Sequence, residues 1–159
     1  MNIRACIDIG GTKVSVSLND PARGLELLAR QYAPTARTGD NEAVARQVMA
    51  LVDAACAELS VDPVQVQDAG VAAPGPFVLG PGGIELATPN ICGALTGGDS
   101  HLPNDWRTAP IEGPLRRRFA RLRVENDGIA ALEAERRWGA LQGIDHCAYV
   151  TWRTGVGCG

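Results

Sequence analysis

The sequence breaks twice from a strand-like run into a glycine turn, once at residues 8–13 and once at residues 154–159. After the first turn, residues 14–18 alternate between apolar and polar side chains, which is typical of a half-buried strand. A Walker-type phosphate loop would instead open a helix at this point. The pattern therefore predicts a β-hairpin at the start of the chain, and the fold must be built around the sheet that contains it.

The residues of the first turn suit the binding of phosphate. Gly10 and Gly11 let backbone N–H groups approach an anion without a Cβ atom in the way, and the Thr12 hydroxyl and Lys13 ammonium add donors. Glycine pairs are also common in hairpin turns that bind nothing, so a purely structural turn stays open as an alternative.

A carboxylate stands at a second informative position. Asn126 and Asp127 follow a strand predicted at residues 122–125 and precede a helix predicted at residues 127–138. An aspartate at the start of a helix either caps it or serves as a general base, because helix N–H groups favour its ionised form. The residues alone leave both interpretations open.

The remaining patterns predict a mixed α/β domain. Asp40 is a candidate N-cap for the first long helix, and the Gly- and Pro-rich residues 77–110 predict a long loop with a hairpin through residues 80–83. The predicted strands are residues 3–9, 13–19, 25–32, 68–73, 122–125 and 146–152, and the predicted helices are residues 41–59, 112–120 and 127–138.

Composition and charge exclude several classes of protein. The chain has 159 residues, a net charge of −3 and arginines that are mostly spread out, so it offers no broad basic face for nucleic acid. No apolar run is long enough to span a membrane. The five cysteines form no Cys-x-x-Cys pair and the two histidines are isolated, so we predict no zinc site. Scattered cysteines and the absence of a signal-like N-terminus favour the cytoplasm.

Five motifs in order resemble the N-terminal half of a ROK-family sugar kinase, a family of the actin, hexokinase and Hsp70 superfamily. They are residues 8–13, 70–76, 88–90, 125–127 and 154–157. The resemblance covers essentially the whole chain and implies an α/β fold of the ribonuclease-H-like (actin-like ATPase) type with a mixed five-stranded sheet. The first lobe would span residues 1–118, and residues 119–159 would begin a second, nucleotide-binding lobe. The family's chains are much longer, so we expect a truncated or partial kinase.

The same resemblance implies ATP-dependent phosphorylation of a hexose, either glucose or an N-acetylhexosamine. Asp8 would hold Mg²⁺ through water. A sugar hydroxyl is a poor nucleophile at neutral pH, so we predict Asp127 as the general base that accepts its proton. The sugar would contact Gly75, Asn90, Asn126 and Asp127, although Asn90 also fits a plain turn residue. The phosphates of ATP would contact Gly10, Gly11, Thr12, Lys13, Thr154, Gly155 and Gly157.

Two residues depart from the family pattern, and two alternatives to an active kinase stay open. Arg153 and Cys158 stand where the family has smaller residues in the second glycine turn. The chain could be a sugar-binding protein without catalysis, or an incomplete fragment that needs a partner such as a second copy in a homodimer. Asp8 lies too close to Met1 for the DNA-binding domain of the family's repressors to precede it, so we do not expect a repressor.

Overall fold

A mixed sheet of five strands forms the centre of the protein. The computed structural model describes residues 3–96, 101–152 and 156–159. Within these, the strands stand in the order β3-β2-β1-β4-β8. β1 pairs in parallel with β4 and β4 in parallel with β8, whereas β2 pairs antiparallel with β1 and β3. The predicted α/β class and mixed five-stranded sheet are confirmed. The strands are β1 (Arg4–Ile9), β2 (Lys13–Asn19), β3 (Leu28–Pro34), β4 (Asp68–Ala73) and β8 (Arg121–Asn126).

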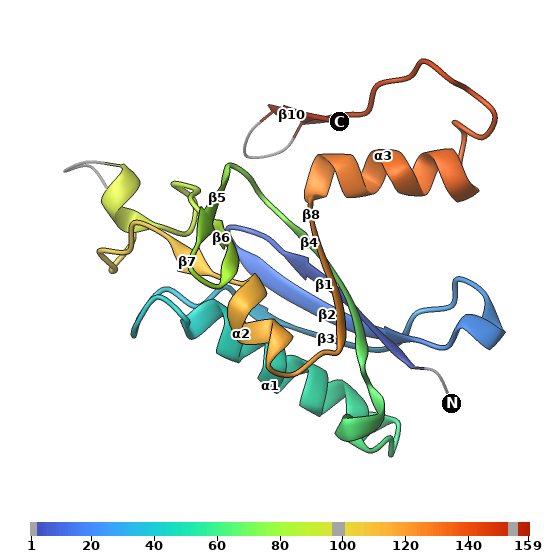
Figure 1. Ribbon diagram of the computed structural model, residues 1–159, viewed down its shortest axis with the longest axis horizontal. Coiled ribbons are helices and arrows are strands. Elements are labelled where there is room, and N and C mark those ends of the chain that lie inside the picture. The colour runs from blue at the N-terminus through green and yellow to red at the C-terminus, as the bar shows by residue number, and fades with distance from the viewer. Residues whose placement is uncertain (1–2, 97–100, 153–155) are drawn as a thin grey trace.

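The lower face of this sheet in Figure 1 is covered by α1 (Ala43–Glu58) and the short α2 (Glu112–Arg116). The hairpin predicted at the start of the chain is confirmed, and its apolar residues alternate on the core face of β1 and β2. β2 is not the half-buried strand that the sequence predicted, because Ser15 and Ser17 on its opposite face are buried as well. Burying each Val, Leu or Ile stabilises the fold by about 1.5–3 kcal/mol. The buried set includes Ile7, Ile9, Val14, Val16 and Leu18 on the sheet and Val44, Val48, Val52 and Ala55 on α1.

Asp40 does not occupy the N-cap position that the sequence predicted for the first helix. Glu42 is the N-cap residue, and its side chain makes no capping hydrogen bond. Asp40 lies two residues before the N-cap. Its Oδ1 accepts a hydrogen bond from Glu42 N–H at 2.9 Å, and its carbonyl accepts one from Ala43 N–H at 3.1 Å. A hydrogen bond from Arg46, followed by the bond from Glu42 N–H, lowers the pKa of the Asp40 carboxyl.

Three other predicted elements are shorter in the structure. β3 begins at Leu28 rather than residue 25, because the Asn19 side chain donates to the carbonyls of Gly24 and Glu26 and holds them in a loop. α2 ends at Arg116. The strand predicted at residues 146–152 is β9 (Val150–Trp152), which pairs antiparallel with β10 (Val156–Cys158).

The described residues between 77 and 110 include strands where the sequence predicted a long loop. The hairpin predicted at residues 80–83 is confirmed, and it joins β5 (Phe77–Gly80) to β6 (Gly83–Leu86). β7 (Ala109–Pro110) adds a third strand in the order β5-β6-β7. Short 3-10 helices lie at Pro21–Arg23, Pro63–Gln65 and Gly93–Leu95.

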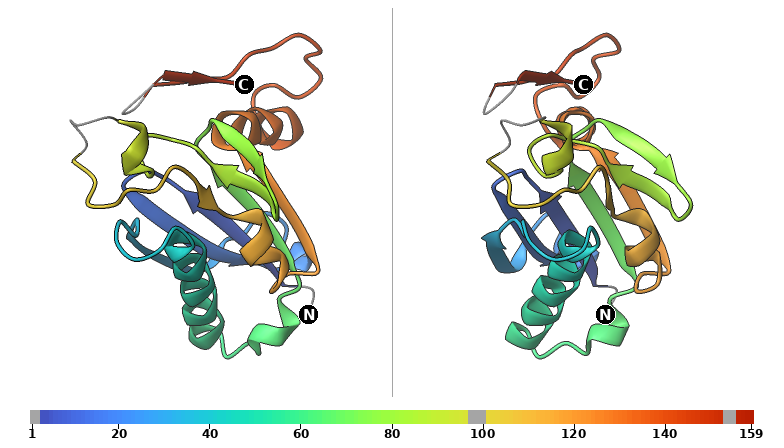
Figure 2. Two further views of the ribbon diagram at one scale, coloured as in Figure 1. Left: turned by 60° about the vertical axis from the view of Figure 1, so that its left-hand side comes forward. Right: turned by 90° about the vertical axis from the view of Figure 1, so that its left-hand side faces the viewer.

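α3 (Asp127–Trp138) begins and ends as predicted and lies on the other side of the sheet from α1 and α2, with the β9–β10 hairpin beyond it (Figures 1 and 2). The sequence placed a lobe boundary between residues 118 and 119. β8 lies beyond that point and forms the edge strand of the central sheet, which therefore continues to Asn126. None of the helices in the described residues has the length and apolar character needed to cross a membrane.

An ion-pair cluster joins the amino ends of three parallel strands. Asp68 at the start of β4 accepts from Arg121 at the start of β8 through both carboxylate oxygens, and Arg4 of β1 lies 3.8 Å away. The hydrogen bonds from Arg121, and then the charge of Arg4, lower the pKa of Asp68. This contribution to stability is present above the carboxyl's unfolded pKa and is lost as the pH falls through the lower folded pKa.

We expect Asp68→Asn to lower the thermal midpoint by about 2 °C at pH 7, because both arginine partners are largely exposed and solvent screens their attraction to the carboxylate. The difference between wild type and variant should shrink as the pH falls below about 4. Thermal melts followed by circular dichroism at pH 7, 5 and 3 measure it. Asp105→Asn, at an exposed position, is the control and should melt like the wild type. A loss that is equal at all three pH values would contradict this account.

Candidate functional site

The candidate residues that follow β1, β4 and β8 lie at one edge of the sheet. Asp8 of β1 pairs with Ala72 of β4, which pairs with Glu125 of β8, so the three strands end level with one another. The glycine turn follows β1, Gly75 follows β4 and Asp127 follows β8. In open α/β sheets, ligands bind outside the carboxyl ends of the strands.

The first glycine turn is closed by a hydrogen bond from Gly10 N–H to the Lys13 carbonyl at 2.8 Å. Among the described residues, the N–H groups of Gly11 and Thr12 have no protein acceptor. The side chains of Thr12 and Lys13 are exposed, and the Lys13 ammonium lies 5.6 Å from the centre of the Tyr32 ring. The turn therefore offers two free backbone donors, a hydroxyl and a cation, which is the chemistry of an anion site.

Asn90 lies against this turn, although it is far away in the sequence. A Cβ atom built on Gly11 would lie 2.7 Å from the Cβ of Asn90, which is closer than real Cβ contacts. The loop that carries Asn90 is folded back by the N–H groups of Ile91 and Cys92, which both donate to the Thr88 carbonyl. The structure thus places one predicted sugar residue beside the predicted phosphate turn.

Asn126 and Gly75 also meet, and the contact involves the start of α3. Asn126 is the N-cap of α3, and its Oδ1 accepts from Gly128 N–H at 3.0 Å and Ile129 N–H at 3.3 Å. Its Nδ2 lies 3.3 Å from the position of a Cβ on Gly75. Because Asn126 caps the helix, the N-cap interpretation of Asp127 is wrong. The exposed Asp127 carboxylate accepts from Gly128 N–H at 2.9 Å through Oδ1.

The second glycine turn is only partly visible. Arg153, Thr154 and Gly155 lie outside the described residues. Gly157 lies in β10 opposite Thr151, and Cys158 is exposed. The end of this hairpin packs on the start of α3, where a Cβ on Gly159 would lie 2.7 Å from the Gly128 carbonyl. The hairpin therefore touches the residue that follows Asp127.

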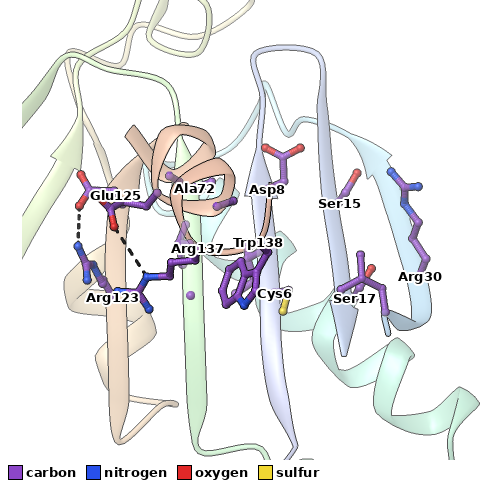
Figure 3. A pocket seen from close by; sticks show the side chains of 17 residues that line it. Cys6, Asp8, Ser15, Ser17, Arg30, Ala72, Arg123, Glu125, Arg137 and Trp138 are labelled. Atoms are coloured by element: carbon purple, nitrogen blue, oxygen red, sulfur yellow. Dashed lines mark hydrogen bonds and ion pairs between the residues drawn. The ribbon is translucent and has the colours of Figure 1, made fainter. Parts of the chain in front are cut away.

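A cavity of about 630 Å³ lies between α3 and the face of the sheet opposite α1 (Figure 3). Asp8 points into it from β1, beside Ser15 of β2. Ion pairs line the other wall, with Arg123 3.2 Å from Glu125 and Arg137 3.8 Å from Glu133. Burial raises the pKa of the Cys6 thiol on the cavity floor, an effect that the charge of Arg4 only partly offsets. Local sequence patterns do not reveal this cavity, because residues of five strands and a helix line it.

The described residues hold no group of three or more His, Cys, Asp or Glu side chains placed to bind a metal ion. Asp8 remains the candidate for Mg²⁺. A single carboxylate suits an ion that keeps several waters and otherwise binds substrate phosphates.

The sequence matches the ROK family over residues 4–159. The chain belongs to the ROK family. Two similar solved structures are the ROK hexokinase of Thermus thermophilus, at 30% identity and a TM-score of 0.70, and a ROK-family glucokinase of Streptomyces griseus in complex with glucose and AMPPNP, at 28% and 0.62. The match covers 99% and 98% of this chain, but only 46% and 43% of theirs.

An inorganic polyphosphate/ATP-glucomannokinase of Arthrobacter is also 28% identical, with a TM-score of 0.62. The match covers 99% of this chain and 57% of that one. This family member thus spans about half the length of these solved relatives. No curated protein matches the chain.

We expect Gly11→Ala to lower the free energy of unfolding by about 1–3 kcal/mol, because the added methyl group would collide with Asn90 and force the turn and the loop apart. Urea unfolding followed by circular dichroism measures the loss. Gly70→Ala is the matched control, since a Cβ there meets nothing within 4 Å, and it should stay within about 0.5 kcal/mol of the wild type. Equal losses in both variants would show that the contact with Asn90 does not constrain the turn.

Proposed function

We propose that this chain forms the sugar-binding and phosphate-binding part of an ATP-dependent sugar kinase, with Asp127 as the general base. The observation that carries the proposal is the contact of Gly11 with Asn90, since it joins a turn with anion-binding chemistry to a loop with a polar amide. The relatives support it, because two are described as a hexokinase and a glucokinase, the latter in complex with glucose and AMPPNP.

On the phosphate side, the proposal assigns Gly10, Gly11, Thr12 and Lys13 to the phosphates of ATP. The free N–H groups of Gly11 and Thr12 and the Lys13 ammonium would stabilise negative charge on the phosphate oxygens. Asp8 would hold Mg²⁺ through water, and the ion would neutralise further phosphate charge. Thr154, Gly155 and Gly157 are proposed as a second phosphate turn.

On the sugar side, Asn90, the Nδ2 of Asn126 and the Gly75 backbone would position the hexose. The Asp127 carboxylate would accept the proton of the reacting hydroxyl while that oxygen forms a bond to the terminal phosphorus and the bond to ADP breaks. General base catalysis of this kind contributes about 10²- to 10⁴-fold. The capping bonds of Asn126 hold the start of α3, and with it the Asp127 backbone, against the ends of the strands.

The two-lobe organisation is part of the proposal. Since β8 completes the first sheet, we place the passage to the second lobe after Asn126, at α3, rather than after residue 118. A cytoplasmic location and a homodimer stay predictions.

The test is hexose-dependent release of ADP from Mg-ATP, with glucose, mannose, N-acetylglucosamine and N-acetylmannosamine as candidates. It is run on the 159-residue chain and on a chimera in which this chain replaces the matching part of the Thermus thermophilus hexokinase. Turnover by the chimera supports the kinase assignment, and turnover by the chain alone would also show that its own residues suffice. Hexose binding without turnover in either protein would favour a non-catalytic sugar-binding protein.

We expect Asp127→Asn to lower kcat by about 10²- to 10⁴-fold in whichever protein turns over, the 159-residue chain or the chimera, because the amide cannot accept the hydroxyl proton. Hexose affinity should change by less than about threefold, since the amide keeps the shape and polarity of the carboxylate. Kinetics and calorimetric hexose binding measure the two effects. Asp145→Asn, an exposed aspartate, is the charge-matched control and should keep full activity. Loss of hexose binding together with turnover would make Asp127 a binding residue instead.

A further inference from the structure

Three consecutive carbonyl groups of the glycine turn are contacted by one short segment that follows β3. The Thr35 hydroxyl donates to the Gly10 carbonyl at 2.6 Å, and Thr35 N–H donates to the Thr12 carbonyl at 3.0 Å. Between them, Arg37 Nη2 lies 3.5 Å from the Gly11 carbonyl. The segment from Thr35 to Arg37 therefore lies along the carbonyl side of the turn.

The position of Thr35 follows from the register of the β2–β3 pair. Lys13 lies opposite Pro34, so Thr35 is the first residue beyond the ladder and lies beside the turn. Thr35 is 4% exposed. A buried hydroxyl needs a hydrogen-bond partner, and here the Gly10 carbonyl provides it.

Contacts that hold these carbonyls also fix the direction of the N–H groups of Gly11 and Thr12. The C=O and N–H of one trans peptide group point in opposite directions across a rigid plane. The Gly10 carbonyl shares its peptide group with Gly11 N–H, and the Gly11 carbonyl shares its own with Thr12 N–H. Contacts from Thr35 and Arg37 thus turn both N–H groups away from the segment. These are the two N–H groups for which the described part of the chain offers no acceptor.

We propose that Thr35 is a positioning residue for phosphate binding. Its hydroxyl fixes the peptide between Gly10 and Gly11 so that Gly11 N–H faces a phosphate of a triphosphate chain. The inference rests on the proposed function, because that function assigns the turn to phosphate. Arg37 supports the same geometry at the next peptide. Within the described residues the Arg37 side chain has no carboxylate partner. The Arg37 backbone is held in place, because Asn104 Nδ2 donates to the Arg37 carbonyl at 3.1 Å.

The test is a titration of the ¹⁵N-labelled chain with MgATP and, separately, with magnesium tripolyphosphate, which lacks the nucleoside. We expect Thr35→Val to weaken both ligands about tenfold and to remove the shifts of the Gly11 and Thr12 amide resonances. Thr35→Ser keeps the hydroxyl and should bind within about twofold of the wild type. The inference would be overturned if Thr35→Val bound both ligands as tightly as the wild type, or if Thr35→Ser bound them as weakly as Thr35→Val.

Thr35 is buried, so an exposed second variant keeps the inference testable if Thr35→Val does not fold. Arg37→Ala should weaken both phosphate ligands about threefold. Arg46→Ala removes the same charge from an arginine that pairs with Asp40 at 2.8 Å, and it should leave the affinity unchanged. Equal affinities of these two variants would overturn the inference.

The same titration separates this inference from the proposed function. If the wild-type chain binds MgATP and the Thr35 and Arg37 variants all bind it with the same affinity, only the positioning role is refuted. A wild-type chain that binds glucose but neither phosphate ligand refutes the phosphate assignment of the turn, and the positioning role of Thr35 with it.

Discussion

The parallel pairing of β1, β4 and β8 is the constraint on which the candidate site depends. Because these strands run in one direction and end level with one another, the residues that follow them emerge at the same edge of the sheet. The ion pairs of Asp68 with Arg121 and Arg4 act at the opposite ends of the same strands. A shift of β8 by one residue would break that cluster and would also move Asn126 away from Gly75.

Close backbone approach is the second constraint, and it explains two of the glycines. At Gly11 a side chain would collide with Asn90, and at Gly75 it would crowd the Asn126 amide. Each glycine therefore lies where two segments from different parts of the sequence meet. The contact of Gly11 with Asn90 joins the turn after β1 to the loop after β6. The contact of Gly75 with Asn126 joins the turn after β4 to the start of α3.

The candidate site also depends on side-chain hydrogen bonds that hold the backbone rather than a ligand. Asn126 uses its side-chain oxygen as the N-cap of α3, and the Asp127 carboxylate shares only the Gly128 N–H with it. Thr35 and Arg37 contact the carbonyl side of the glycine turn, and the N–H groups of Gly11 and Thr12 have no partner among the described residues. In both places, ordinary satisfaction of backbone hydrogen bonds determines which polar groups remain available to a ligand.

The sequence by itself determined the type of most elements and the identity of the family. Period-two alternation predicted the first hairpin, because the apolar residues of its strands pack on the core face of the sheet. The ordered motifs predicted the ROK family. Element ends were less predictable, because hydrogen bonds from distant residues set them, as Asn19 does for the start of β3.

Only the tertiary structure decided which candidate residues meet. The motif at residues 88–90 marked Asn90 but not the turn that it contacts, and nothing in the local pattern distinguishes Thr35 from an ordinary loop residue. Both contacts with the glycine turn are long-range. The same holds for the cavity beside Asp8, whose walls come from separate strands and from α3. Local periodicity records which side of an element is buried, whereas a binding site is defined by the distances between elements, and those are set by strand order and register.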